Sequence, residues 1–309
     1  MNDEKFDVVC VASWNADLIS QVARPIARGE TLMASAFSIS PGGKGSNAAV
    51  AAARQGARVA LIARIGDDDF GRMGLALWHA EGIETAHVEC AMGERSGVAQ
   101  IVVYDDGDNS IAVFTGAGAG LGAQQVNAAS PILQNCRVVM APCEAPLKAV
   151  KQAFALAKEA GAITLLNPAP AQRLPDDLLA LIDVLTPNES EVVALTGAAA
   201  SADSAAADLL ARGVGAVIVT LGAAGCRIYQ PGQSALDLPG HRMVVKDTIG
   251  AGDTFTGALA AELARGKSLP NAARWANAAA ALSVTRPGAI DGVPLRADVQ
   301  ALMDRPGGA

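Results

Sequence analysis

The chain has 309 residues, of which 51% are apolar and only 4% aromatic, so its core must be built from alanine, valine, leucine and isoleucine. Its formal net charge is −7 and it has no run of basic residues, which argues against nucleic acid and anionic membranes as partners. The cysteines are scattered and form no C-x-x-C pair, which favours reduced thiols over a structural zinc site. No apolar run approaches a membrane span, and Phe6–Ala12 is too short for a signal peptide. We therefore expect a soluble, cytoplasmic protein.

Short apolar runs alternate with helical patterns along the chain. Strands are expected at Val8–Ala12, Arg58–Ala63, Val138–Ala141, Ala162–Leu166, Val184–Thr186 and Val214–Leu221. Helices are expected at Lys44–Gln55, Phe70–Glu81, Pro146–Ala160, Thr254–Arg265 and Asn271–Val284, of which the last two close the chain. Strands that alternate with helices predict parallel βαβ units. The expected fold is therefore of the α/β class, a three-layer α/β/α sandwich with a mostly parallel central sheet.

Two stretches break this alternation. Residues 18–40 alternate in polarity, are punctuated by glycine and proline, and show no clear helix. Residues 97–115 match a hairpin, with strands Val98–Tyr104 and Ser110–Phe114 around a turn at Asp105–Asn109. We interpret both stretches as a small β-sheet that covers a site at one edge of the main sheet; the alternative is that they are ordinary edge strands of that sheet.

The segment Asp247–Phe255 is the most informative stretch of the sequence. Gly250, Ala251 and Gly252 leave backbone N–H groups uncovered at the start of a helix, and such groups form an anion site together with the helix dipole. Asp253 places a carboxylate inside that site, where it would repel a bound anion. A general base held beside a reacting phosphate accounts for both features.

Two polar clusters lie near the N-terminus. Asn15 and Asp17 follow the first expected strand, and ligands of open parallel sheets bind beyond the carboxyl ends of strands. A turn or a helix cap is the alternative for this pair. The segment Gly42–Asn47 places paired glycines at a helix start, with Lys44 and Asn47 in the first turn. It lacks the Walker A spacing, and a simple loop-to-helix turn is the alternative.

Three further positions follow later strands. Asn188 and Glu191 are three residues apart and share a helix face, where they suit either a hydrated magnesium phosphate or a helix cap. Thr220–Gly225 is a glycine-rich turn that could meet a nucleotide or be a plain β-turn. Glu144 could accept a hydrogen bond from a substrate hydroxyl or be a surface charge.

The two glycine-rich segments carry a family resemblance. Pro41–Asn47 and Asp247–Phe255 resemble the two signature regions of the ribokinase-like, PfkB-type carbohydrate kinases. Further segments resemble the same family in the same order, at Ala12–Asp17, Leu166–Ala171, Leu185–Glu189 and Ala281–Ala289. The resemblance covers roughly residues 6–304.

The resemblance implies an α/β/α sandwich with a β-sheet lid, so that residues 1–309 form one kinase domain whose lid lies at about 18–40 and 97–115. It implies ATP-dependent phosphorylation of a sugar's primary hydroxyl, with D-ribose as the first expectation and ribose 5-phosphate as the product. It also implies a homodimer joined through the lid strands. A kinase for deoxyribose, fructose or adenosine is the alternative within the class, and a non-catalytic sugar-binding regulator is the alternative outside it.

The resemblance also implies roles for individual residues. Asp253 would be the base, and Gly250, Ala251 and Gly252 would form the anion hole. The positions that match sugar contacts are Asn15, Asp17, Gly43, Lys44, Asn47, Glu144 and Asp253. The positions that match nucleotide contacts are Asn188, Thr220, Leu221, Gly222, Ala223, Ala224, Gly225, Gly252 and Asn277. Glu191 matches an acidic residue associated with Mg²⁺, and a K⁺ ion would be held by loop positions at Asp247, Ile249, Ser283, Arg286, Gly288 and Gly292.

The chain departs from common members of the family at several of these places. Gly118 replaces an asparagine, Asn277 a histidine and Gly292 a serine. Trp14 is bulky for a residue beside the expected sugar contacts, and Phe114 makes the approach to the lid less polar.

Overall fold

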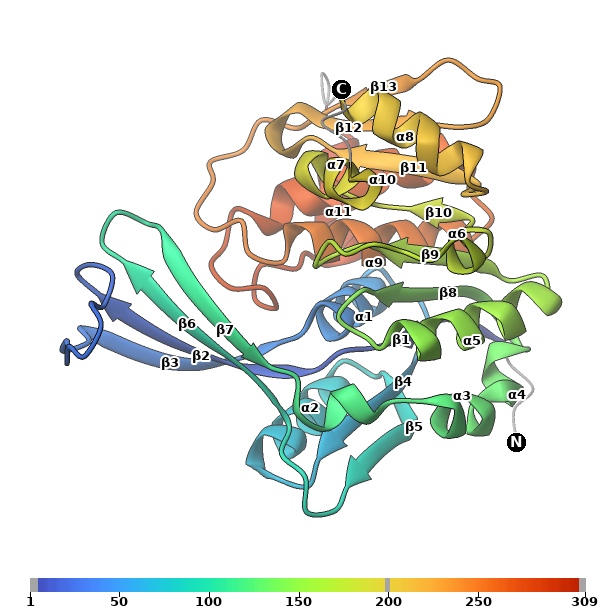
Figure 1. The fold of residues 1–309 in the computed structure, drawn as a ribbon. Helices are drawn as coiled ribbons and strands as arrows, with labels where there is room; N and C mark the ends of the chain where they lie inside the picture. The colour runs from blue at the N-terminus through green and yellow to red at the C-terminus, as the bar shows by residue number, and fades with distance from the viewer. Residues whose placement is uncertain (1–4, 198–200, 306–309) are drawn as a thin grey trace.

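The computed structural model describes residues 5–197 and 201–305 (Figure 1). The strands are β1 Phe6–Val11, β2 Asn15–Val22, β3 Ala36–Gly42, β4 Val59–Gly66, β5 Glu84–Ala91, β6 Gly97–Tyr104, β7 Asn109–Phe114, β8 Cys136–Pro142, β9 Ile163–Asn167, β10 Val184–Leu185, β11 Ala216–Thr220, β12 Gly225–Tyr229 and β13 Leu236–Pro239. The α-helices are α1 Lys44–Arg54, α2 Asp69–Ala80, α3 Ala123–Ala128, α4 Ser130–Leu133, α5 Leu147–Glu159, α6 Asp176–Leu179, α7 Glu189–Thr196, α8 Ala202–Ala211, α9 Ala251–Ala264, α10 Leu269–Ser283 and α11 Arg296–Met303. Short 3-10 helices lie at Gly116–Gly120 and Gly222–Ala224.

The main sheet has the strand order β13-β12-β11-β10-β9-β8-β1-β4-β5. Its strands pair in parallel from β11 through to β5, and β12 and β13 add an antiparallel edge. The central strand β1 has no exposed side chain from Val8 to Val11, because helices cover both faces of the sheet. The expected α/β class with a mostly parallel sheet is therefore confirmed.

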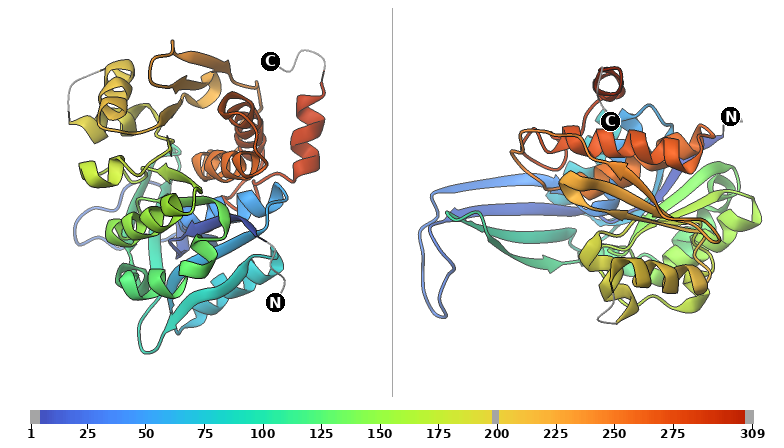
Figure 2. Two further views of the ribbon diagram at one scale, coloured as in Figure 1. Left: turned by 90° about the vertical axis from the view of Figure 1, so that its right-hand side faces the viewer. Right: turned by 90° about the horizontal axis from the view of Figure 1, so that it is seen from above.

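Helices form a layer on each side of the sheet (Figure 2). One core lies between the sheet and α1, α2, α9, α10 and α11, and the other lies between the sheet and the helices α3 to α8. Alanine supplies much of both cores, which lets helices approach the sheet and one another closely. The low aromatic content of the sequence is consistent with this packing.

A second sheet of four strands, in the order β3-β2-β6-β7, projects from one end of the molecule (Figure 1). Strands β2 and β6 are parallel, and the two outer pairs are antiparallel. The expectation of a separate small sheet is confirmed, and the alternative of ordinary edge strands is wrong. The small sheet begins at Asn15 rather than Leu18, because Asn15 already pairs with Gly97 and Gly42.

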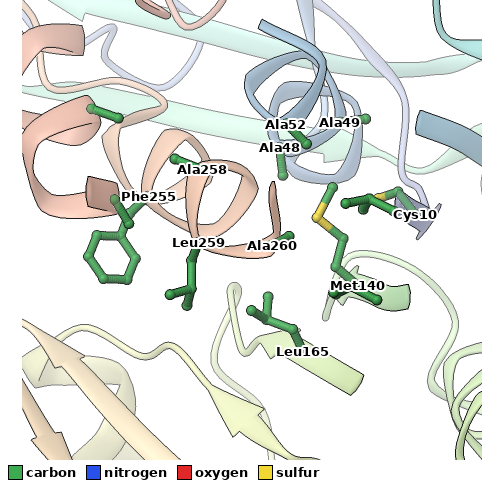
Figure 3. Close-up of a cluster of buried hydrophobic side chains, with 14 of the residues drawn as sticks. Cys10, Ala48, Ala49, Ala52, Met140, Leu165, Phe255, Ala258, Leu259 and Ala260 are labelled. Carbon is green, nitrogen blue, oxygen red and sulfur yellow. The ribbon is translucent and has the colours of Figure 1, made fainter. Parts of the chain in front are cut away.

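Helices α1 and α9 pack against each other beside the middle of the sheet. Figure 3 shows alanines of both helices close to Met140 and Leu165 of the underlying strands. The helices touch most closely at Gly257, where an added Cβ would lie 2.1 Å from the carbonyl oxygen of Ala48. This close packing brings the N-terminal turns of α1 and α9 together, and both turns carry expected site residues.

Two expectations about the helices need correction. Helix α9 begins at Ala251 rather than Thr254, because Gly250 adopts a left-handed conformation with φ of 75° and the helix starts directly after it. Helix α11 follows the two helices that were expected to close the chain. The strands β5, β12 and β13 were also not predicted. Strands β5 and β13 are the two edges of the sheet and have partly polar sequences, and β12, which lies between β11 and β13, has only five residues.

The cysteines are all free thiols, four of them buried, as expected from their spacing. Within residues 5–197 and 201–305, no helix has both the length and the apolar character needed to cross a lipid bilayer. A cytoplasmic location remains a prediction.

Candidate active site

Asp253 lies in the first turn of α9, and its side chain is only 5% exposed. The N–H groups of Gly252 and Asp253 have no protein acceptor among the described residues, whereas that of Ala251 donates to the Thr248 carbonyl at 3.3 Å. Of the three N–H groups expected to be uncovered, those of Gly250 and Gly252 have no acceptor among the described residues, and the N–H of Asp253 is free in addition. An added Cβ on Gly252 would meet nothing within 4 Å, so open space lies next to these donors.

Two carboxamides hold the carboxylate of Asp253. Nδ2 of Asn47 donates to Oδ2 at 2.9 Å, and Nδ2 of Asn167 donates to Oδ1 at 3.4 Å. Asn47 comes from α1 and Asn167 from the end of β9, so three elements meet at this carboxylate. Asn167 lies in the family-like segment Leu166–Ala171, but no role was predicted for it from the sequence. Its position at the carboxyl end of a buried strand was the signal that could have found it.

Asn15 and Asp17 lie on one face of β2, since they are two residues apart. An added Cβ on Gly97 would lie 2.2 Å from Oδ1 of Asn15, and one on Gly42 would lie 2.2 Å from Oδ1 of Asp17. The two glycines therefore leave the space that these polar side chains occupy. The carboxylate of Asp17 has no hydrogen-bond partner among the described residues.

Glu144 lies at the N-terminus of α1. Its Oε2 accepts hydrogen bonds from the Lys44 N–H at 2.8 Å and from the Ser13 hydroxyl at 2.7 Å. The Ser13 hydroxyl in turn accepts from the Gly45 N–H at 3.0 Å. Glu144 thus neutralises free N–H groups at a helix start, a role that neither of the two sequence interpretations contained. Ser13 was also missed.

Burial and like charges raise the pKa values of Asp253 and Asp17. Burial raises the pKa of Asp253 to about 6, although the Lys44 ammonium and the Asn47 hydrogen bond oppose the shift. Burial, followed by the charge of Glu144, raises the pKa of Asp17 to about 6, and Lys44 opposes this shift too. Burial alone would lower the pKa of Lys44, but the surrounding carboxylates outweigh it and raise that pKa. Lys44 is therefore the cation that lets these acids share one site.

Two buried polar atoms have no partner in the described structure, namely Oδ1 of Asn47 and Oγ1 of Thr254. A buried acceptor without a donor costs free energy unless another molecule supplies the hydrogen bond. Oδ1 of Asn47 belongs to the carboxamide whose Nδ2 binds Asp253. A ligand with hydroxyl groups beside Asp253 could therefore donate to this oxygen.

Asn188 and the turn Thr220–Gly225, which were expected at a nucleotide, come together at the ends of β10 and β11. Asn188 and Glu191 form a reciprocal helix cap on α7, with Oδ1 of Asn188 accepting from the Glu191 N–H and Oε2 of Glu191 accepting from the Asn188 N–H, both at 2.8 Å. The capping interpretation is therefore confirmed. The negative charge of Glu191 also acts on Asp253 and Lys44, so it reaches the same site.

The glycine-rich turn Thr220–Gly225 joins β11 to β12 and lies next to Asn188, which bridges to Thr220. Gly225 has φ of 101°, and an added Cβ would lie 2.1 Å from the Leu238 carbonyl oxygen, so its glycine is required by the hairpin itself. Asn277 lies apart on α10, where its Nδ2 donates to the Pro239 carbonyl at 2.7 Å. The turn therefore lies at the start of β12, and Asn277 contacts the end of β13.

The positions expected at a monovalent cation form two linked loops. Oδ1 of Asp247 accepts from the Ile249 N–H at 2.9 Å, and Oδ2 accepts from the Gly288 N–H at 2.8 Å. A Cβ added to Gly292 would lie 2.7 Å from the Ser283 carbonyl oxygen, 2.8 Å from that of Gly288 and 3.5 Å from that of Arg286. These carbonyl oxygens converge, and oxygen ligands of this kind suit a hard cation. In the part of the chain described by the structure, no group of three or more His, Cys, Asp or Glu side chains is arranged to hold a metal ion.

The family of the chain follows from comparison with known proteins. Residues 5–296 match the family model described as "pfkB family carbohydrate kinase". The chain belongs to the pfkB family of carbohydrate kinases. It is 39% identical over 298 residues to a ribokinase from Haemophilus influenzae, covering 95% of this chain and 97% of the relative. It is 34% identical over 293 residues to a deoxyribokinase from Salmonella typhi, covering 93% of this chain and 95% of that protein.

The fold of the kinase agrees with the same family. It is similar to the structure of Arabidopsis thaliana ribokinase complexed with ribose and ATP, with a TM-score of 0.92, 31% identity, and coverage of 98% of this chain and 100% of that one. The ribokinase-like fold expected from the sequence is therefore confirmed, and the protein is a sugar kinase.

Two departures from the family pattern lie away from the expected sugar contacts. The ring of Trp14 is buried against Trp78 at a centroid distance of 5.3 Å, and its Nε1 donates to the Phe70 carbonyl. Phe114 lies opposite Val98 on the neighbouring strand, and Val98 lies opposite Ala16, so these three side chains share one face of the small sheet. Asp17, the next residue after Ala16, points to the other face. Neither side chain narrows the space beside Asp17.

Proposed function

We propose that the kinase transfers the γ-phosphoryl group of ATP to the primary hydroxyl of D-ribose and so forms ribose 5-phosphate and ADP. The carrying observation is the buried carboxylate of Asp253, which lies at a helix start with free N–H groups and next to Asn47, whose Oδ1 has no partner among the described residues. The 39% identity to a ribokinase and the fold shared with a ribokinase complexed with ribose and ATP support this choice.

We propose that Asp253 is the general base. As the hydroxyl oxygen of the sugar bonds to the γ-phosphorus, its proton passes to a carboxylate oxygen of Asp253, and the bond from phosphorus to the bridging oxygen of ADP breaks. A pKa of about 6 leaves the group ionised at neutral pH while bringing it closer to the pH at which it acts. The carboxamides of Asn47 and Asn167 orient the carboxylate from either side.

The helix start Gly250–Gly252 is proposed as the anion hole. Donors that are already fixed can stabilise the charge that builds on the phosphoryl oxygens without reorganising during the reaction. The unpaired N–H of Gly252 and the open space beside its Cα support this role. Ala251 contributes through the positive end of α9 rather than through a fully free N–H.

The sugar is proposed to lie between the small sheet and α1. The side chains of Asn15, Asp17 and Glu144 offer hydrogen-bond acceptors, and Lys44 offers a cation. Gly43 lets the start of α1 pass close to the segment before β2, because an added Cβ there would lie 2.8 Å from the Trp14 Cα. Hydroxyl groups are the donors that this acceptor-rich set requires. The small sheet acts in this proposal as a lid that excludes water, which would otherwise compete as the phosphoryl acceptor.

ATP is proposed to bind along the ends of β10 and β11, with its phosphates directed to the start of α9. The residues proposed to contact it are Asn188, Thr220, Leu221, Gly222, Ala223, Ala224, Gly225, Gly252 and Asn277. Mg²⁺ would enter with the phosphates, and the charge of Glu191 fits a site at which water completes the coordination.

A K⁺ ion is proposed beside the anion hole. The converging carbonyl oxygens at Gly292 and the carboxylate of Asp247 fit such an ion. When bound, it would add positive charge near the phosphoryl group. Gly292 offers no side-chain ligand, so the ion would depend on backbone oxygens such as those of Ile249, Ser283, Arg286 and Gly288.

The second candidate substrate is 2-deoxy-D-ribose, because a deoxyribokinase is nearly as similar to this chain as the ribokinases. A panel of D-ribose, 2-deoxy-D-ribose, D-fructose and adenosine, assayed by ADP formation, decides between the candidates. We expect the highest kcat/KM for D-ribose, since a site built to bind hydroxyl groups discriminates against an analogue that lacks one. A higher kcat/KM for 2-deoxy-D-ribose or adenosine would contradict D-ribose as the substrate.

Gly252→Ala tests the anion hole. The new methyl group meets no protein atom within 4 Å, so thermal stability should change little, while the methyl occupies the space proposed for the phosphoryl group. Because the methyl group keeps the phosphoryl oxygens away from the N–H donors, we expect kcat to fall by about 100-fold, comparable to the loss of one such donor. Gly118→Ala is the matched control, because its added Cβ lies 3.6 Å from the nearest atom, and it should keep kcat. Equal kcat values in both variants would exclude this position as the anion hole.

We propose that two lid sheets pack together in a homodimer. Ile111 and Val113 point to the same face of the sheet as Asp17 and are 56% and 55% exposed, an apolar surface that a second copy would cover. Analytical ultracentrifugation should find a dimer for the wild type and a monomer for Ile111→Asp. Leu295→Asp, at an exposed apolar residue outside the lid, should remain dimeric. A monomeric wild type would contradict the proposal.

A further inference from the structure

Arg54 lies at the C-terminal end of α1, about 15 Å along the helix from Lys44. Its Nη1 donates to the carbonyl oxygens of Ile290 and Val293 at 2.7 and 3.0 Å. Its Nε and Nη2 bind the carboxylate of Glu81, the closest contact being 2.6 Å. The Arg54 and Glu81 side chains are only 18% and 17% exposed, so solvent screens this arrangement weakly.

The two carbonyls belong to a tight turn, Gly288–Val293. The Gly292 N–H donates to the Gly288 carbonyl at 3.0 Å, and the Val293 N–H donates to the Ile290 carbonyl at 3.1 Å. Arg54 therefore binds a turn that is already closed by its own hydrogen bonds. The guanidinium group therefore fixes the position of that turn relative to α1.

The other side of this turn meets the start of α9. A Cβ on Gly250 would lie 2.9 Å from Cβ of Ala289, so the turn and the proposed anion hole are in direct contact. The Gly288 N–H binds Asp247, and the carbonyl of Gly288 is one of those that converge at Gly292. A displacement of the turn would therefore move both the cation ligands and the backbone before Asp253.

Gln55 adds a second link from the same end of α1. It is fully buried, and its Nε2 donates to the Pro294 carbonyl at 2.9 Å. Its Oε1 accepts from Nε1 of Trp275 at 3.0 Å, which ties the link to α10. Helix α1 thus binds Asp253 through Asn47 at its start and fixes the segment after α10 at its end.

We propose that Arg54 is a positioning residue that sets the Gly288–Val293 turn and, through it, the monovalent-cation ligands and the start of α9. The inference rests on the cation site in the proposed function. Arg54 touches neither the cation nor the substrates in this proposal. Its effect is carried by the backbone of the turn.

Arg54→Met removes the guanidinium group and keeps much of the apolar side chain. Thermal melts are recorded while KCl replaces choline chloride at constant ionic strength, and the midpoint shift gives the K⁺ affinity without any assay of turnover. We expect K⁺ to stabilise the wild type and its apparent Kd to rise about tenfold in Arg54→Met, as for other residues that orient metal ligands. D-ribose affinity from calorimetry should stay unchanged.

Arg212→Met is the matched control. Arg212 also binds a backbone carbonyl and a carboxylate, those of Leu174 and Asp176, and its side chain is 25% exposed. It lies on the opposite helical layer, so this control should lose stability and keep the wild-type Kd for K⁺. If Arg54→Met does not fold, Arg54→Lys replaces it; a lysine can keep a contact with Glu81 but has no planar fork for both carbonyls, so its Kd should also rise.

The outcomes separate this inference from the proposed function. A folded Arg54→Met or Arg54→Lys variant that melts lower but keeps the wild-type Kd for K⁺ would show a purely structural role and overturn the inference. A wild type that does not respond to K⁺ would overturn the cation site and the inference together. The D-ribose kinase assay on the wild type judges the proposed reaction independently of either result.

Discussion

Asp253 is buried at the start of α9, where free N–H groups favour a negative charge and burial opposes it. Burial outweighs the Lys44 ammonium and the Asn47 hydrogen bond and raises the pKa of Asp253 to about 6, and most other features of the site follow from keeping that carboxylate in place. Asn47 and Asn167 bind its oxygens from two different elements, and Lys44 supplies the opposing charge. A solvated aspartate would need none of these partners, but it would also be less able to receive a proton near neutral pH.

This constraint links the architecture to the chemistry. Gly257 allows α1 and α9 to pack closely enough for Asn47 to reach Asp253. The small sheet adds Asn15 and Asp17 from the other side, over glycines that leave room for their side chains. The end of β9 reaches the start of α9 through Asn167, and the loop around Asp247 leads directly into the same helix start. The site therefore depends on several elements whose backbones approach closely, which suits a chain rich in alanine and glycine.

Sequence patterns predicted what depends on local order and missed what depends on long-range contact. The central strands, α1, and the hairpin of β6 and β7 were predicted because their apolar periods and turn residues are strong. The edge strands β5 and β13 were missed because partly exposed strands carry weak patterns, and β12 was missed because five residues that include a glycine and an arginine show no clear apolar run. Asn167 and Ser13 were missed because their partners lie 86 residues and 131 residues away in the chain. Trp14 looked intrusive in sequence because nothing local shows that its ring turns toward α2.

The pH dependence of kcat/KM for D-ribose, measured with MgATP kept saturating, tests most directly whether Asp253 is the base. A base acts only when ionised, so activity should be full above its pKa and should be lost as the pH falls through about 6. Asp17 and Asp253 both have a pKa of about 6, and the Asp17→Asn variant distinguishes them. If Asp253 is the base, the activity of this variant should still fall as the pH drops through about 6. A limb displaced to the ordinary aspartate value of 3.8, or one that disappears in Asp17→Asn, would contradict the account.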